Sequence, residues 1–194
     1  MNYLAHIYLS GENDELKIGN FIADSVKGKQ FIHFPIKVQK GIILHRAIDT
    51  YTDAHPTVRK STHRLFENYS HYSSVIVDIY YDHFLAANWE FYSPIPLEEY
   101  VDDFYALLQK NESILPNRVK QFLPYMIDAN WLLSYASIEG IGRILWQMNL
   151  RTGKRSKMDL AVKDLQEYYP LFESEFKSFF KDLEQFTGEH IPKL

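Results

Sequence analysis

The spacing of the apolar residues limits what this chain can fold into more than any other feature. Apolar side chains recur at helical intervals through most of the 194 residues, and the alternating runs typical of strands are scarce. Glycines and prolines fall between the periodic segments, where helices end. We therefore expect an all-α fold with helices at about residues 2–9, 13–27, 36–52, 56–67, 72–91, 97–110, 115–134, 137–151 and 156–185.

The length of the chain predicts one domain. A chain of 194 residues buries about 70% of its unfolded surface and needs no disulfide or structural metal to fold. Seven of the eight histidines lie in the first 83 residues, whereas the second half consists mainly of apolar and aromatic packing patterns. We expect a compact single-domain helical bundle over residues 1–194, with the chemistry in residues 1–90 and mainly packing helices in residues 97–185.

Composition excludes several functional classes. The chain has no cysteine, which excludes thiolate catalysis and cysteine-ligated zinc. A net charge of −4 argues against a general affinity for nucleic acid. No segment approaches about 18 consecutive apolar residues, and the first ten residues lack the basic start of a signal peptide. We expect a cytoplasmic protein without a membrane span, and its oligomeric state is left open.

The helix expected over Val75–Trp89 carries charge within an apolar face. Asp78 and Asp82 lie one turn apart among apolar residues, and His83 lies at the edge of the same arc. Burying unpaired carboxylates costs several kcal/mol each. The pattern therefore predicts a positive partner for these aspartates, which can be an arginine, a lysine or a metal ion.

A second helix, within Gly41–Pro56, repeats this pattern. His45 and Asp49 are spaced i, i+4 on one face, and Gly41, one turn earlier, leaves room for another backbone or a ligand. Arg46 points about 100° away from His45, which makes it available to a phosphate or a carboxylate.

Two further segments each contribute one such residue, His6 near the start and Asp24 in the motif GNFIADSVKGK. Imidazole and carboxylate ligands together suit Mn²⁺, Fe²⁺ or Zn²⁺, and a mixed cluster without cysteine favours catalysis over a structural role. Each pair alone also has a structural interpretation as a hydrogen bond within the core. The repetition over four segments favours a metal site.

These motifs resemble one family in particular. The segments NYLAHIYLS, GNFIADSVKGK, GIILHRAIDTYTDAHP, HYSSVIVDIYYDHFLAANW and GIGRILWQMNLR are similar to those of the acyl carrier protein phosphodiesterases. The resemblance extends from Met1 to about Phe180. It implies a helical, HD-domain-like fold, a divalent metal typified by Mn²⁺ with Mg²⁺, Fe²⁺ or Zn²⁺ possible, and hydrolysis of holo-acyl carrier protein to apo-protein and 4′-phosphopantetheine, a reaction of fatty acid biosynthesis.

The resemblance also implies roles for the cluster as a group. The general HD pattern contains an adjacent His-Asp pair, whereas this chain has Asp82 followed by His83, so individual ligands are not transferred from HD enzymes. The metal ligands implied are His6, Asp24, His45, Asp82 and His83. The residues implied in catalysis are Asp78 or Asp49 as the base, with Arg46 and Lys27 holding the phosphate.

Holo-acyl carrier protein, the partner implied, is strongly acidic and requires a basic docking surface. Two clusters offer one, the lysines Lys27, Lys37 and Lys40 or the later motif RTGKRSK at residues 151–157. One alternative function is an HD-type phosphohydrolase acting on a nucleotide or another small phosphate ester. A second alternative is a non-enzymatic helical binding module in which the His/Asp pairs are structural.

Overall fold

The computed structural model describes all 194 residues and contains helices and no strands, as the apolar spacing predicts. The α-helices are α1 (Tyr3–Tyr8), α2 (Asp14–Ile22), α3 (Ile36–Ala54), α4 (Pro56–Tyr69), α5 (Ser73–Ala87), α6 (Leu97–Lys110), α7 (Asn117–Asp128), α8 (Trp131–Ser134), α9 (Ile138–Arg151), α10 (Ala161–Glu167) and α11 (Tyr169–His190). Short 3₁₀ turns connect them, namely η1 (Ala23–Ser25), η2 (Gln30–His33), η3 (Ser70–Tyr72), η4 (Trp89–Phe91), η5 (Glu112–Ile114), η6 (Met158–Leu160) and η7 (Ile191–Lys193).

Two of the expected helices are each divided in two. The segment expected over 115–134 forms α7 and α8, because Asn130 adopts a left-handed backbone conformation with φ of 43°. The segment expected over 156–185 forms η6, α10 and α11. A proline in the first turn of α11 has no backbone N–H and cannot continue the preceding helix.

Helices α2 and α3 pack at backbone contact through two glycines. A Cβ atom on Gly41 would lie 2.3 Å from the carbonyl oxygen of Leu16, and one on Gly19 would lie 2.1 Å from that of Val38. Neither position accepts a side chain, which confirms the prediction that Gly41 admits another backbone. This contact brings α2 against the first turns of α3.

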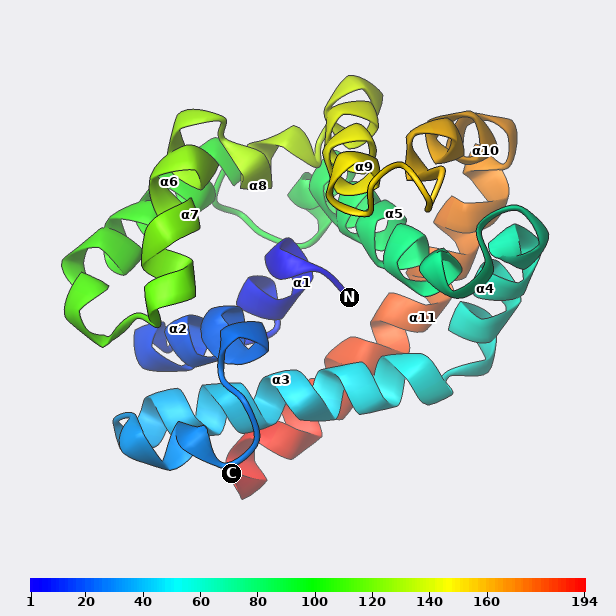
Figure 1. The fold of residues 1–194 in the computed structure, drawn as a ribbon. Helices are drawn as coiled ribbons and strands as arrows, with labels where there is room; N and C mark the ends of the chain where they lie inside the picture. Colours follow the sequence, from blue (N-terminus) through cyan, green and yellow to red (C-terminus); the bar gives the residue numbers. More distant parts are fainter.

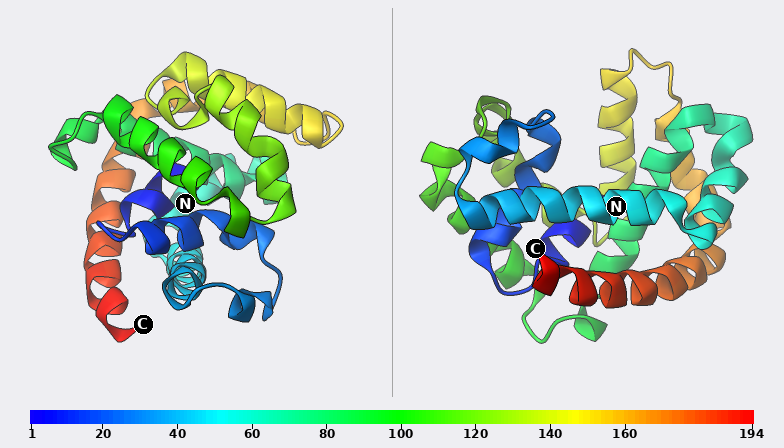
Figure 2. Two further views of the ribbon diagram at one scale, coloured as in Figure 1. Left: turned by 90° about the vertical axis from the view of Figure 1, so that its left-hand side faces the viewer. Right: turned by 90° about the horizontal axis from the view of Figure 1, so that it is seen from below.

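Helix α1 lies near the centre of the molecule. Figures 1 and 2 show it enclosed by the other helices, and it packs against α2 and α5. The long C-terminal helix α11 returns to pack against α3, α4 and α5. Its phenylalanines at 172, 176, 179 and 180 are fully buried and join an aromatic core with Tyr80 and Tyr81 of α5. Helix α11 therefore holds α3, α4 and α5 in place through this core.

None of the helices combines the length and apolar character needed to cross a bilayer.

Candidate active site

Three side chains from α1 and α3 meet in one cluster. His6 comes from α1, and His45 and Asp49 come from successive turns of α3. One ligand atom from each lies within 4.8 Å of the others. Nε2 of His6 is 3.2 Å from Oδ1 of Asp49, and Nε2 of His45 is 3.1 Å from Oδ2 of Asp49. The two imidazole rings stack with their centroids 3.9 Å apart, so both present Nε2 to the same carboxylate.

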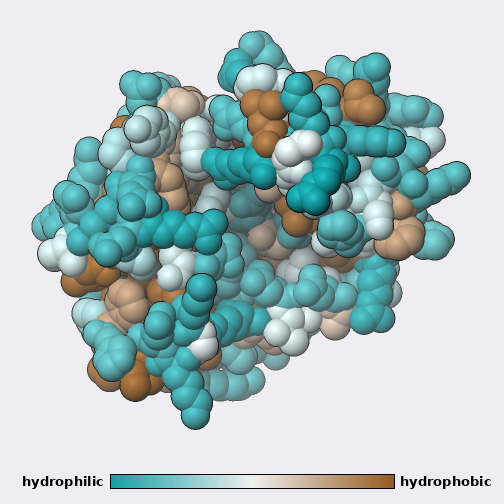
Figure 3. Space-filling model, in the orientation of Figure 1, coloured by the Kyte–Doolittle hydropathy of each residue, from teal (hydrophilic) through white to brown (hydrophobic).

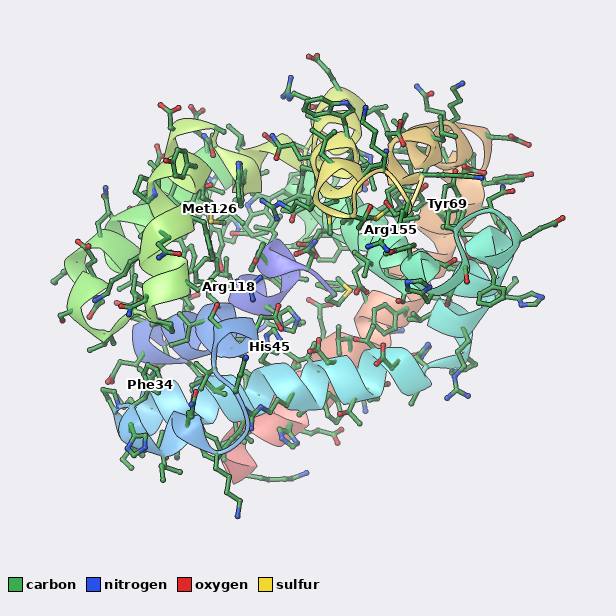
Figure 4. The ribbon with its side chains drawn as sticks, in the orientation of Figure 1. Phe34, His45, Tyr69, Arg118, Met126 and Arg155 are labelled. Carbon is green, nitrogen blue, oxygen red and sulfur yellow. The ribbon has the colours of Figure 1, made fainter.

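Asp24, in η1, is the fourth member of the cluster. Its Oδ1 atom lies 3.3 Å from Nε2 of His45, and its side chain is 68% exposed. Figure 4 shows His45 on the side of α3 that faces α1, at the edge of the central opening. The structure thus brings together four residues predicted from three separate segments.

Asn20 of α2 fixes the tautomer of both histidines. Its side-chain amide donates to the carbonyl of His6 and to the hydroxyl of Ser10, which leaves its Oδ1 as an acceptor. That Oδ1 atom is 2.8 Å from Nδ1 of His6, and the backbone carbonyl of Asn20 is 2.9 Å from Nδ1 of His45. Both Nδ1 atoms therefore carry a hydrogen, and in each neutral ring the lone pair is on Nε2.

The two histidines of the cluster differ in their protonation at pH 7. Burial and the neighbouring His45 lower the pKa of His6 to about 4. Burial also lowers the pKa of His45, but hydrogen bonds to Asp24 and Asp49 outweigh it and raise the pKa to about 9. Burial would raise the pKa of Asp49, yet its close contacts with the two histidines hold the pKa well below the usual range. His6 is therefore neutral at pH 7, and its buried Nε2 faces a carboxylate without a hydrogen bond.

The cluster lies in a cavity of about 280 Å³. The lining is almost entirely polar and consists of Met1, Asn2, Tyr3, His6, Asn20, Asp24, His45, Asp49, Asp53, Ser74 and Asp78. Figure 3 shows the corresponding face of the molecule hollowed near its centre, with hydrophilic side chains around the hollow. A larger groove of about 810 Å³ lies elsewhere, between α2, α6 and the end of α11, but it contains no histidine. The chemistry therefore points to the smaller cavity.

Asp82 does not join the cluster, although the sequence placed it among the expected ligands. Its Oδ1 accepts the backbone N–H of Asn2 at 3.1 Å, and its Oδ2 accepts that of Leu4 at 2.7 Å. Both N–H groups belong to the start of α1, where helix N–H groups have no partner within the helix. Burial raises the pKa of Asp82 to about 7. The carboxylate thus anchors the first turn of α1.

Asp78, one turn earlier on α5, lines the cavity and has a positive partner. Its Oδ1 atom is 2.9 Å from the ammonium group of Met1. The expectation of a cation beside the α5 aspartates is therefore met by a backbone terminus, in addition to any metal at the neighbouring cluster. Burial lowers the pKa of this ammonium, but the charges of Asp78, Asp49 and Asp82 together outweigh the effect and raise the pKa overall.

His83 also lies outside the cluster. Its Nδ1 atom donates to the carbonyl of Tyr135 at 2.7 Å, and its Nε2 atom is 3.1 Å from the hydroxyl of Tyr169. Both ring nitrogens are occupied by residues of the second half of the chain. His83 therefore links α5 to α11 and to the end of α8, and it has no free nitrogen for a metal.

Of the two expected phosphate ligands, Arg46 bonds the backbone on both sides of Lys27. The Nη2 atom of Arg46 donates to the carbonyl of Val26 at 3.2 Å and to that of Gly28 at 2.8 Å. These two carbonyls flank Lys27, whose side chain is exposed. Arg46 thus holds the backbone on both sides of Lys27, and neither side chain lines the cavity.

Three features of the cavity were not expected from the sequence, namely Ser74 in its lining, the Met1 ammonium, and the contacts of Asn20 with both histidines. Asn20 offered one sequence clue, because it follows a glycine within an apolar helical pattern, which indicates a close helix contact. The N-terminal group offered none, since its position depends on the packing of α1 against α5.

Comparison with known proteins gives consistent results. A family model described as acyl carrier protein phosphodiesterase matches residues 1–183. A protein of that name from Pectobacterium atrosepticum is 28% identical over 186 residues, covering 95% of this chain and 96% of the relative. Its namesake from Photorhabdus laumondii is 29% identical over 181 residues, covering 93% and 91%. The Salmonella agona protein is 32% identical over 183 residues, covering 93% and 94%.

No solved structure matches the chain, so the HD-domain-like character of the fold stays a prediction. The family model, in contrast, covers α1 to α10 and most of α11, and therefore includes every residue of the cluster and its cavity. The chain belongs to the acyl carrier protein phosphodiesterase family.

Proposed function

We propose that this protein is a metal-dependent phosphodiesterase that hydrolyses holo-acyl carrier protein to apo-acyl carrier protein and 4′-phosphopantetheine. The substrate follows from the family and from the names of its relatives. One observation supports the metal most directly: the buried Nε2 of His6, neutral and without a hydrogen-bond partner, is aimed at a carboxylate that His45 also faces.

The donor set fits a divalent cation. Two imidazole nitrogens and the carboxylates of Asp49 and Asp24 form a mixed nitrogen and oxygen set that suits Mn²⁺, with Mg²⁺, Fe²⁺ or Zn²⁺ as alternatives. We assign His6, His45, Asp49 and Asp24 as the ligands. Asp82 and His83 are left out, because their polar atoms are already bonded to the fold.

The protein residues divide the remaining work. When bound, the ion would neutralise phosphoryl charge and make water more acidic. Asn20 keeps both imidazoles in the tautomer that offers Nε2. Asp78, on the cavity wall, is the carboxylate assigned to take the proton from the attacking water. Lys27, held from both sides by Arg46, is assigned to the phosphate.

In the proposed reaction, water oxygen forms a bond to phosphorus while the bond from phosphorus to the serine oxygen of the carrier breaks. Asp78 accepts one proton of the water, and the departing serine oxygen takes up a proton from solvent. The products are the free serine hydroxyl of the apo-carrier and the phosphomonoester of pantetheine.

The test begins with protein stripped by dialysis against a chelator. Holo-acyl carrier protein is added with and without Mn²⁺, Mg²⁺, Fe²⁺ or Zn²⁺, and the carrier is analysed by mass. We expect loss of the phosphopantetheine mass only when a metal is restored. Full activity of the stripped protein, with no metal found by elemental analysis, would contradict the metal site. Turnover of a nucleotide panel without phosphopantetheine release would instead remove the substrate assignment.

A further inference from the structure

The last residue of α9 and the loop that leads from it to η6 are here together called the cationic loop. It spans residues 151–157 and carries four positive side chains. These are Arg151, Lys154, Arg155 and Lys157, and all four are exposed. The lysines and arginines that form ion pairs with carboxylates are Lys37, Lys60, Arg64, Arg143 and Lys177. The charges of the cationic loop are therefore not neutralised within the protein.

A buried polar network holds the backbone of this loop. Ser156 is 1% exposed, and its hydroxyl donates to Oδ1 of Asn149 at 3.0 Å. The hydroxyl of Thr152 donates to Ser156 Oγ at 2.9 Å. Asp159, the next acidic residue along the chain, accepts from the amide of Asn149 at 2.6 Å. The loop thus presents its charges from a fixed backbone.

The conformation of the loop is an unusual one for lysine. Lys154 and Lys157 have φ angles of 62° and 54°, and Gly153 between the helix and Lys154 has φ of 63°. Residues with a Cβ atom rarely adopt this region, and such strain persists only where the surroundings enforce it. Asparagine or glycine would fit both positions with less strain. The structure around the loop therefore holds both lysines in this strained conformation.

An aromatic series joins the cationic loop to the candidate active site. The guanidinium of Arg151 lies 5.6 Å from the ring centroid of Trp131, and Trp131 stacks on Phe122 at 6.0 Å. Phe122 in turn lies 6.4 Å from the ring of Tyr3, which lines the cavity. The loop is thus connected to the cavity through three neighbouring rings.

Arg118 of α7 adds a further charge beside this path. Burial and the charge of Asp24 raise the pKa of Tyr3, whereas Arg118 and Arg151 act in the opposite direction. Arg118 precedes Phe122 by four residues on α7, so the two side chains share a face of that helix. Figure 4 shows Arg118 and Arg155 on opposite sides of the central opening. In both views of Figure 2, the cationic loop projects on the same side of the molecule as the segment between α2 and α3.

The lysines on the other side of the opening are a weaker docking surface. Lys37 is 3.6 Å from the carboxylate of Glu15, which neutralises part of its charge. Lys40 is only partly exposed. The guanidinium of Arg46 donates hydrogen bonds to backbone carbonyls and lies over the ring of Phe31. The cationic loop is the denser group of unpaired charge, with four exposed cations within seven residues, whereas Lys27 and Lys29 are the exposed unpaired lysines between α2 and α3.

We propose that the cationic loop and Arg118 form the docking surface for an acidic helix of the carrier protein. The phosphopantetheine arm then extends along Trp131, Phe122 and Tyr3, so that its phosphate reaches the cavity. This inference rests on the proposed function, since it names where that substrate binds. Complementary charge of this kind mainly accelerates encounter and weakens as salt rises.

The test measures binding and turnover separately. Fluorescently labelled apo-acyl carrier protein, which lacks the scissile bond, is titrated with wild type and with a triple variant, Lys154→Glu, Arg155→Glu and Lys157→Glu. Arg118→Glu, on a different helix, is the second variant. Lys110→Glu with Lys181→Glu is the charge control, because both lysines are exposed and form no ion pair with a carboxylate. Metal content and unfolding temperature report whether each variant is intact.

At low salt we expect the triple variant to bind the carrier about 10- to 100-fold more weakly and to lose kcat/KM for holo-carrier by a similar factor. Arg118→Glu should lose several-fold, and the control less than 2-fold. An intact triple variant that binds as well as wild type would overturn the docking surface while the proposed function stands. Carrier binding to wild type without phosphopantetheine release would overturn the function while the docking surface stands. Binding of an oligonucleotide or of anionic lipid vesicles, with no carrier binding, would overturn both.

Discussion

Helices α3 and α5 carry the same kinds of residue in similar surroundings, yet they use them differently. On α3, the free polar atoms of His45 and Asp49 face other ionisable side chains around a cavity. On α5, each polar atom of Asp82 and His83 has a partner that belongs to the fold, such as a backbone N–H, a carbonyl or a tyrosine hydroxyl. The comparison teaches that a His or Asp within the fold indicates a functional site when its polar atoms have no partner among the backbone or structural side chains.

Substitutions in the α3 cluster should have the largest effect. His45→Ala or Asp49→Ala removes a proposed metal ligand, so we expect kcat to fall by at least about 1,000-fold. The helical fold should persist, but the free energy of unfolding should fall by about 1–2 kcal/mol, because His45 is buried, bonds the carbonyl of Asn20 and pairs with Asp49. Turnover and urea unfolding measure the two effects. If both variants kept more than a tenth of the wild-type rate, the cluster would lose its assigned role.

Asp82→Ala should reverse this pattern. It leaves two buried N–H groups at the start of α1 without an acceptor, which should cost about 3 kcal/mol of unfolding free energy. We expect turnover of the folded protein to fall far less than in the α3 variants. Asp82→Asn is the matched control, since it keeps the size and one acceptor and should lose less stability. Unchanged stability of Asp82→Ala together with complete loss of bound metal would identify Asp82 as a ligand after all.

The cluster should also respond to pH, in a higher range than Asp82 of α5, whose pKa is about 7. The pKa of His45 is raised to about 9 in the metal-free protein, so its stabilising contribution is complete below pH 6.5 and is lost as the pH rises through 9. Because a bound metal requires the neutral ring, metal binding at pH 7 should release about one proton, and affinity should rise about tenfold per pH unit up to 9. Calorimetry in buffers of different ionisation enthalpy measures this release. Metal binding without proton release would contradict the proposed state of His45.

The smallest effect is expected for His83→Phe. The ring shape is kept, but the carbonyl of Tyr135 and the hydroxyl of Tyr169 each lose a partner. We expect a loss of about 1–2 kcal/mol in unfolding free energy and a change in kcat of less than 3-fold. Thermal unfolding with a parallel rate measurement checks both values. A large drop in kcat with unchanged stability would show that α5 takes part in the chemistry.

Local patterns were sufficient for the helices and for part of the site. Apolar spacing placed α3, α6 and α9 close to their observed bounds, because these helices begin and end at local breakers. The spacing of His45 and Asp49 fixed that they share a face, since helix geometry depends only on separation along the chain. Gly41 indicated a close contact for an equally local reason, the absence of a Cβ atom.

What the sequence determined by itself is therefore which residues share a face of a helix and which breaks separate the helices. Only the tertiary structure decided what each face meets. His45 meets His6 because Gly19 and Gly41 bring α2 and α3 into backbone contact, and Asp82 meets the first turn of α1 because that turn lies against α5. A carboxylate is the same group in both places. Its role depends on its partners, which are backbone N–H groups for Asp82 and imidazole nitrogens for Asp49. Most of these partners are distant in the chain.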